Sequence, residues 1–556
     1  MKKDKLQPKL FSVMKTYTKE QFVKDVISGI IVAIIALPLS IALALASGVG
    51  PEQGIYTAII AGFLISFFGG SRVQIAGPTA AFATIVAGIV AKNGMEGLAT
   101  ATVLAGVLLI LMGVFRLGTL IKFIPYTITT GFTAGIAVTI LVGQLKDFFG
   151  LTYEAGVENI ETLDKVANVI KFFPTINLWA VLVGVVCLLI QIVWPKVSQK
   201  IPGSLIAVIA GILIVKLGNL PVNTIGDLYQ ISGSLPSLVL PDFSFRMIRT
   251  VFSDAVTIAI LAAIESLLSC VVADGMIGSK HRSNMELVAQ GIGNMGSALF
   301  GGIPATGAIA RTAANIKNGG RTPIAGMVHS IVLVLVLVVL MPYAAWIPMP
   351  TIAAILFIVA YNMCQYRAFV NLCKTAPKSD ILVLVVTFVL TICFDLVVAI
   401  EVGMILAGLL FMKRMSDETE VRGWKYSEEE ESGAEEENDP MALSLRKVPK
   451  QVRVYEINGP MFFGMTDLIS DITLKDFTKV LIIRMRGVPA LDASAMRSLE
   501  ALYDRCNQQG VQVLFSHVNE QPRKTMEKDG FIAKVGEDHF CSHIDDALEK
   551  AQKFLA

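Results

Sequence analysis

Long apolar runs separated by short polar breaks fill residues 26–412, whereas the chain beyond residue 416 reads as a soluble sequence. A helix needs about 20 apolar residues to span the hydrocarbon core of a bilayer. Clear candidates for such helices lie at 26–46, 53–68, 98–115, 131–149, 178–194, 204–216, 256–272, 324–341, 352–362, 381–394 and 397–412. With three weaker segments, one near 287–300 and two broken by glycine and proline, the pattern predicts about fourteen crossings.

The two broken segments read IAGPTAA at 75–81 and GGIPATG at 301–307. Proline suits the first turn of a helix, where its missing N–H costs nothing, so each segment predicts a short helix that begins at its proline. Two helix N-termini that face each other inside a membrane direct positive dipole ends and free backbone N–H groups at an anion. Short interrupted segments in matching positions of two halves are typical of the binding site of a secondary transporter. The pattern therefore predicts an anion carrier.

Composition and charge distribution support a membrane protein with both ends in the cytoplasm. Of the 556 residues, 54% are hydrophobic and 17% are charged, and the mean hydropathy is +0.64, which is too apolar for an ordinary soluble protein. The lysine-rich segment 1–25 has no signal-peptide pattern and is expected on the cytoplasmic side of the cell inner (plasma) membrane. The seven cysteines are scattered, and four lie in apolar runs, which favours buried small hydrophobes over disulfides.

The sequence after the apolar region divides into a linker and a small α/β domain. Glutamates crowd 428–437, so we interpret 415–447 as a solvated acidic linker between a membrane domain at 26–414 and a domain at 448–556. Strand patterns at 452–457, 480–485 and 511–517 alternate with helical patterns at 493–508 and 544–554. Such alternation over about 110 residues is typical of an α/β fold.

Several motifs, in order along the chain, resemble the SulP family of anion transporters. PEQGIYTA at 51–58, followed by GGSR at 69–72, is close to the family signature and departs from it at Gln53 and Ile55. AIESLL at 263–268, VADG at 272–275 and QGIGN at 290–294 resemble the eighth and ninth helices of the family. IPAT at 303–306 and GGRT at 319–322 resemble its tenth helix, and LDAS at 491–494 resembles a turn of the STAS domain.

The resemblance implies fourteen segments in a seven-plus-seven inverted repeat, built from a core domain and a gate domain, with a cytoplasmic STAS domain. The third and tenth helices of this fold meet head-on at the site of the anion. The implied activity is secondary active transport of a small inorganic oxyanion, by elevator-like movement of the core. Sulfate is the default substrate, and bicarbonate and C4-dicarboxylates are alternatives. The resemblance also implies a homodimer.

The candidate binding residues are small or hydroxyl-bearing residues at the two broken segments, with others carried over by resemblance. Small residues allow an anion to approach backbone N–H groups, and threonine hydroxyls donate as well; packing between helices is the alternative role. The expected binding set is Gly77, Pro78, Thr79, Ala80, Ala305, Thr306, Gly307 and Ala308. By the resemblance, Arg311 lies near the anion, and Leu39, Ser40 and Leu43 face the site from the first helix.

Glu265 is expected to couple transport to a second ion. A carboxylate inside a spanning helix is by default a proton or cation relay. In sodium-using members this position tends to be Asp, so we favour proton coupling over sodium coupling. The alternative role of Glu265 is an ion pair with Arg311.

Other functions find little support in the sequence. The chain carries no nucleophile–base pair or phosphate loop that would indicate an enzyme, and no cofactor or nucleic-acid partner is expected. His539, Cys541 and His543 lack a second ligand pair, so no metal is expected. Ser494 matches a position that is phosphorylated in related STAS proteins, with helix capping by Asp492 or Ser494 as the alternative. A passive anion channel of the same fold remains a second class.

Overall fold

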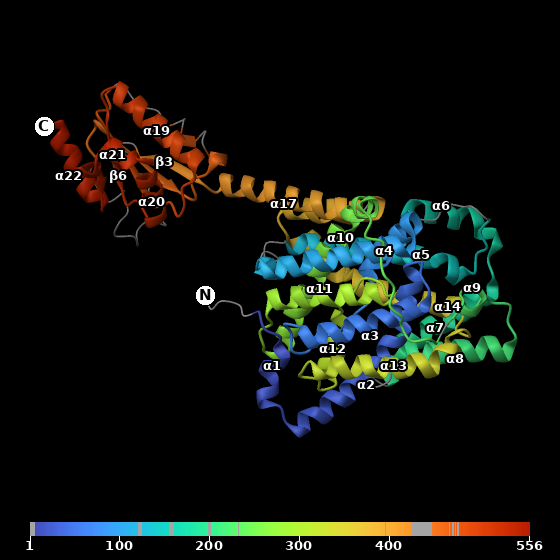
Figure 1. Cartoon of the computed structure of the whole chain (residues 1–556). Coiled ribbons are helices and arrows are strands. Elements are labelled where there is room, and N and C mark those ends of the chain that lie inside the picture. Colours follow the sequence, from blue (N-terminus) through green and yellow to red (C-terminus); the bar gives the residue numbers. More distant parts are fainter. Residues whose placement is uncertain are drawn as a thin grey trace. The chain divides into compact units, whose positions relative to one another are not determined.

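The computed structural model describes residues 6–119, 125–154, 161–197, 202–231, 233–394, 396–424, 448–465, 468–469, 472, 474 and 477–556. The chain separates into two compact units, Met1–Ile405 and Leu406–Ala556. The first unit is mainly helical, and the second contains a mostly parallel sheet with helices (Figure 1).

The described part of the first unit is built of helices, two-residue strands and short 3₁₀ turns (Figure 1). Its α-helices are α1 (Lys9–Val13), α2 (Lys19–Ala46), α3 (Pro51–Phe68), α4 (Ala83–Val114), α5 (Tyr126–Phe149), α6 (Thr162–Phe172), α7 (Leu178–Val197), α8 (Gly203–Gly218), α9 (Ile225–Leu228), α10 (Phe245–Ile277), α11 (Ser283–Leu299), α12 (Ile309–Lys317), α13 (Ile324–Ala344), α14 (Met349–Cys364), α15 (Tyr366–Thr375), α16 (Lys378–Cys393) and α17 (Leu396–Asp417), the last of which continues into the second unit.

Within the described residues, eight helices are long and apolar enough to cross a membrane. That number counts Ala80–Val114 once, although Gly94 breaks it with φ 66° between the two crossings that the sequence predicts there. It also leaves out shorter helices such as α8 and α11. The polytopic helical fold is confirmed, and the total of about fourteen stays a prediction.

Close helix packing in this unit depends on glycine. A Cβ at Gly291 of α11 would lie 2.4 Å from the Gly106 carbonyl oxygen of α4, and a Cβ at Gly54 of α3 would collide with the Ser40 carbonyl oxygen of α2. Small residues allow helix backbones to approach closely in a membrane, where apolar burial does not drive association. The helix backbones therefore pack closely, and this packing positions the polar side chains that lie between the helices.

The two broken segments pair with each other as short strands, and this corrects the prediction that their prolines begin helices. Strand β1 (Ala76–Gly77) is antiparallel to β2 (Thr306–Gly307), with Ala76 opposite Gly307. The helical structure begins only afterwards, at the 3₁₀ turn η2 (Ala80–Phe82) and at α12. Pairing satisfies backbone groups that a membrane interior would otherwise leave without partners. Pro78 and Pro304 fall outside the paired residues, as expected for a residue without an N–H.

The described part of the second unit has a five-stranded sheet in the order β3-β4-β5-β6-β7. The strands are β3 (Glu420–Trp424), β4 (Val452–Asn458), β5 (Val480–Gly487), β6 (Gln512–Ser516) and β7 (Phe540–Cys541), and the helices are α19 (Ala493–Gln508), α20 (Glu520–Asp529), α21 (Phe531–Val535) and α22 (Ile544–Leu555). Strands β4 to β7 are parallel, and two apolar clusters form the core. The predicted α/β fold is confirmed.

Strand β3 corrects the predicted start of the acidic linker at residue 415. Helix α17 extends to Asp417, and β3 pairs antiparallel with β4, so this stretch belongs to the sheet. The charged residues suggested a solvated segment, but edge strands commonly carry charge, and Val421 packs against the larger apolar cluster. Residues 425–447 of the expected linker lie outside the described residues.

Asp492 caps α19, and its removal is expected to loosen that helix. Its Oδ1 accepts from the Ala495 N–H at 2.8 Å, and its Oδ2 accepts from the Phe463 N–H at 3.0 Å. Loss of an N-cap side chain costs about 1 kcal/mol, so Asp492→Ala is expected to accelerate hydrogen exchange of the α19 amides about fivefold. The measurement is hydrogen–deuterium exchange on the full chain. Ser494→Ala is the control with no expected change, and equal exchange in the two variants would contradict the assignment.

Candidate functional site

Glu265 of α10 joins the two broken segments. Its Oε2 accepts the hydroxyl of Thr79 at 3.1 Å and the hydroxyl of Thr306 at 3.0 Å. The two threonines are 227 positions apart in the sequence and belong to the segments around β1 and β2. One carboxylate oxygen therefore receives a donor from each half of the candidate site.

The helix that follows Thr79 has no side-chain cap. Thr79 stands at the N-cap of η2, where a threonine oxygen ordinarily accepts from a backbone N–H of the first turn, and it makes no such bond here. The first N–H groups of a helix have no partner within the helix. An anion beside Thr79 and Ala80 would supply acceptors for them.

On the other segment, three expected donors already have protein acceptors. The N–H of Ala305 donates to Asn294 Oδ1 at 2.8 Å, that of Gly307 donates to Ser266 Oγ at 3.1 Å, and that of Ala308 donates to the Ile75 carbonyl at 2.9 Å. The prediction of a symmetric pair of N–H cradles is therefore wrong for these groups. The extended backbone of β2 turns its N–H groups toward neighbouring segments instead of toward one point.

Arg311 lies beneath the strand pair and does not pair with Glu265. The residue is only 2% exposed, and its Nη2 donates to the carbonyl of Pro78. Its Nη1 is buried with no partner among the described residues. A Cβ at Gly77 would collide with Nη1, so glycine at 77 allows the cation to approach the β1 backbone. Among the described residues, no ion pair joins Arg311 to Glu265. The alternative role of Glu265, as the counter-charge of Arg311, therefore has no contact to support it.

A second buried carboxylate, which the sequence analysis missed, fixes the approach to β1. Glu286 of α11 is fully buried, and its Oε2 accepts from the N–H groups of Gly70 at 2.8 Å and Ser71 at 3.1 Å. Its Oε1 accepts from the side-chain amides of Gln74 and Gln290, each at 3.0 Å. These bonds tie α11 to the segment that leads into β1. Their sequence signal was a row of polar residues on one face of α11.

The three residues expected from the first helix have no described polar contact with Glu265, Thr79 or Thr306. Leu39 is half-buried and Leu43 is buried. Ser40 is buried against Gly54 of α3, and its hydroxyl has no partner among the described residues. Their role in binding stays a prediction.

The match of a family model decides the classification. The model described as the sulfate permease family matches residues 22–387. The chain belongs to the sulfate permease family. A second model, the STAS domain, matches residues 445–547, which confirms the resemblance in the C-terminal part.

Known proteins similar to this chain match it over nearly its whole length. It is 41% identical to "Putative sulfate transporter YvdB" of Bacillus subtilis (strain 168), over 96% of this chain and 98% of that protein. It is 30% identical to the bicarbonate transporter BicA of Picosynechococcus sp. (strain ATCC 27264 / PCC 7002 / PR-6), over 95% of this chain and 94% of that protein. The solved structure of SLC26A9 has a TM-score of 0.87 at 18% identity, covers 99% of this chain and 93% of its own, and shows the shared fold. The family consists of membrane transporters of small anions, and this chain is a multi-pass membrane protein of that kind.

Ser494 of the STAS domain is exposed and is the second residue of α19. Asp492 rather than Ser494 caps the helix. Phosphorylation of Ser494 therefore stays a prediction about an accessible hydroxyl.

Among the described residues, no group of three or more histidine, cysteine or acidic side chains is arranged to hold a metal ion.

Proposed function

We propose that this sulfate permease family member is a secondary active transporter that carries sulfate together with protons. Its place is the cell inner membrane, with the lysine-rich N-terminus and the STAS domain in the cytoplasm, and it works as a homodimer. The core moves in an elevator-like manner and carries the anion between Thr79 and Thr306. Support comes from the family, from relatives named for sulfate transport, and from the positive-inside distribution of lysine.

The observation that carries the proposal is the position of Glu265 Oε2 between the two threonine hydroxyls. An ionised Glu265 occupies both hydroxyl donors and repels an oxyanion through its negative charge. Protonation removes that charge and weakens its hold on the hydroxyls, which then donate to the anion. Proton binding and anion binding thus favour each other, as symport requires.

Arg311 supplies the positive charge in this proposal. A cation buried with an incompletely bonded guanidinium is costly in a membrane interior unless something compensates for it. The negative charge of an oxyanion bound beside β1 and β2 compensates for the positive charge of the guanidinium. Backbone dipoles and hydroxyl groups bind negative charge without selecting one anion. Recognition of sulfate therefore depends on all of the groups around the bound anion together.

Bicarbonate is the second candidate substrate, favoured by the 30% identity to a protein named as a bicarbonate transporter over 95% of this chain. In that alternative the coupling ion is sodium. Fumarate represents the C4-dicarboxylate alternative of the family resemblance.

Uptake into proteoliposomes tests the proposal. The full chain is reconstituted, and uptake of labelled sulfate, bicarbonate and fumarate is measured with a pH gradient, with a sodium gradient, and with neither. We expect sulfate to accumulate only when the pH gradient is present. Accumulation driven by the sodium gradient alone would overturn proton coupling, and accumulation of bicarbonate without sulfate would replace the substrate.

A further inference from the structure

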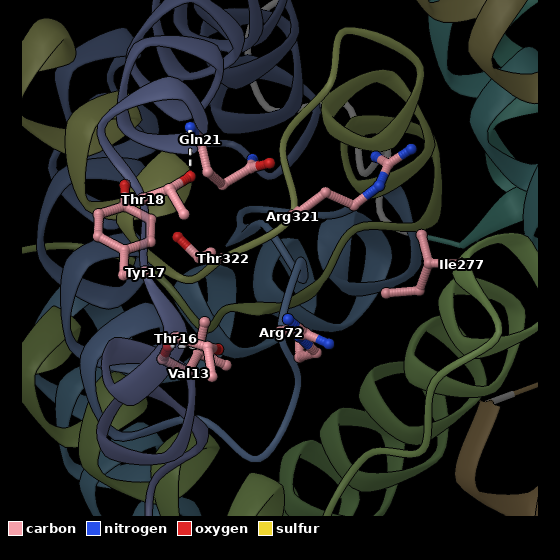
Figure 2. A pocket seen from close by; sticks show the side chains of 9 residues that line it. All are labelled: Val13, Thr16, Tyr17, Thr18, Gln21, Arg72, Ile277, Arg321 and Thr322. Carbon is pink, nitrogen blue, oxygen red and sulfur yellow. Dashed lines mark hydrogen bonds between the residues drawn. The ribbon is translucent and has the colours of Figure 1, made fainter.

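A cavity lies between the N-terminal segment and the helices that it contacts. It has a volume of about 300 Å³ and is lined by Val13, Thr16, Tyr17, Thr18, Gln21, Arg72, Ile277, Arg321 and Thr322. Figure 2 shows Tyr17 and Thr18 on one side, Ile277 on the other, and the two arginines between them. At about 30 Å³ per liquid water, the volume corresponds to about ten waters.

The N-terminal segment is fastened over this cavity by bonds to the core. The N–H of Lys9 donates to the Gly69 carbonyl at 2.8 Å, and its Nζ donates to the Lys280 carbonyl at 2.8 Å. Arg282 donates to the Gln7 carbonyl at 2.7 Å and to Ser12 Oγ at 2.8 Å. The cavity is therefore formed between a fixed segment and the core.

Both arginines of the cavity hold donors without protein acceptors. Arg72 makes no hydrogen bond or ion pair among the described residues, and its Nε is buried. Arg321 uses Nη1 to bond the carbonyls of Ile316 and Gly320, and its other guanidinium nitrogens make no hydrogen bond to the residues that the structure describes. The buried Nε of Arg72 is a donor without an acceptor, which costs about 1–3 kcal/mol and more when the group is charged. Arg72 is also the last residue of the GGSR motif, in which Gly70 and Ser71 bond Glu286 and Arg72 has no role in the transport site.

Asp25, which bonds the Arg321 backbone, already accepts several hydrogen bonds from other donors. Asp25 is fully buried and accepts from the hydroxyl of Tyr17 at 3.0 Å, from Gln21 Nε2 at 2.9 Å and from the N–H of Arg321 at 2.8 Å. It also accepts from the hydroxyl of Thr322 at 2.5 Å. No ion pair between Asp25 and either guanidinium exists among the described residues, and no carboxylate lines the cavity. The cavity thus presents a net positive lining.

We infer that this cavity binds a phosphate group through Arg72 and Arg321. Guanidinium groups match phosphate oxygens in geometry and charge, and bind them through two parallel hydrogen bonds. Thr18 accepts from the N–H of Gln21 and keeps its own hydroxyl proton for a third donor bond. The site is separate from the transport site, and its occupation secures the N-terminal segment to the core.

Exposed apolar side chains beside the cavity indicate that it lies at the depth of the lipid headgroups. They are Phe11 and Met14 of the N-terminal segment and Phe22, Val23 and Ile27 of α2, all between 48% and 55% exposed. A basic site beside an apolar, lipid-facing band suits an anionic headgroup. A free phosphate offers the same chemistry, so the two sources are separated by experiment.

The test uses the purified full chain, with no transport measurement. In one arm, inorganic phosphate is titrated and the thermal midpoint is followed, since a ligand that binds the folded state raises it. In the other arm, binding of phosphatidylglycerol from mixed micelles is counted by native mass spectrometry. The variants are Arg72→Gln and Arg321→Gln, and Lys15→Gln is a matched control because Lys15 is an exposed cation of the same segment outside the cavity.

We expect each arginine variant to weaken binding at least tenfold, consistent with loss of a charged hydrogen bond, while Lys15→Gln binds as the wild type does. A response to phosphatidylglycerol alone identifies a headgroup site, and a response to phosphate alone identifies a free-anion site. Binding that survives both arginine variants but is lost in Arg311→Met belongs to the transport site and overturns the inference. Absence of binding by the wild type in both arms overturns it as well. If one arginine variant does not fold, the other decides.

Discussion

Glu265→Gln is expected to abolish proton-driven accumulation of the anion while leaving anion exchange in place. Glutamine keeps the size of the side chain and an oxygen that accepts from Thr79 and Thr306, whose bonds to Glu265 are 3.1 and 3.0 Å long. It carries no charge and does not titrate, so it resembles the protonated carboxyl that favours anion binding. For one proton per anion, each unit of pH gradient sustains about a tenfold concentration ratio, because 1.4 kcal/mol corresponds to a factor of ten. The variant loses that whole ratio.

The measurement compares two fluxes in the same proteoliposomes: uptake against a gradient driven by external acid, and exchange of labelled for unlabelled anion at equal pH. Glu96→Gln is the matched control, because Glu96 is an exposed carboxylate on α4 and should leave both fluxes unchanged. Loss of accumulation with exchange retained is the signature of a coupling residue. Equal loss of both fluxes, with the protein still folded, would falsify this role for Glu265.

The same variant separates a carrier from a channel. In a passive anion pathway, Glu265 takes no part in coupling, and the conductance of the variant should stay close to that of the wild type. Membrane current is therefore recorded beside the tracer fluxes. A large conductance that is unaffected by the substitution would favour the channel class over the carrier.

The main chemical residues of the site were predictable because the membrane makes polar groups conspicuous. Glu265 and Arg311 stand among apolar neighbours, where charge is costly, and this singles them out without a structure. Thr79 and Thr306 stand beside prolines that interrupt apolar runs. The bonds of both threonines to Glu265 were beyond the sequence, because they depend on how helices far apart in the chain pack together.

Other parts of the site were mispredicted because local rules gave way to pairing between distant segments. Pro78 and Pro304 have the local signature of a helix start, but the backbone beside them forms the β1–β2 pair. The N–H groups of Ala305 and Gly307 looked free within their own segment and are bonded to Asn294 and Ser266. Glu286 was missed because only its distant backbone partners show that it anchors the segment before β1.

Arg311→Met is expected to weaken anion binding severely without destabilising the fold. Arg311 is 2% exposed, its Nη2 donates to the Pro78 carbonyl, and its Nη1 has no partner among the described residues. A buried charge with incomplete compensation costs stability, and an apolar side chain of similar length removes that cost. The thermal midpoint of the variant should therefore equal or exceed that of the wild type. Loss of a charged interaction of about 2–3 kcal/mol corresponds to a KM for sulfate that is about 30–150-fold higher.

Weaker anion binding together with an unchanged or higher thermal midpoint distinguishes a cation that binds the anion from one that supports the fold. KM and kcat are measured by uptake in proteoliposomes, and the thermal midpoint is measured on the purified full chain without anion. Lys317→Met is the matched control, because Lys317 is an exposed cation on the same helix α12 and should change neither quantity. A marked fall in the thermal midpoint would instead identify Arg311 as a support of the β1 backbone. An unchanged KM with a reduced kcat would place its effect in the movement of the core, because only a group that interacts with the bound anion raises KM when it is removed.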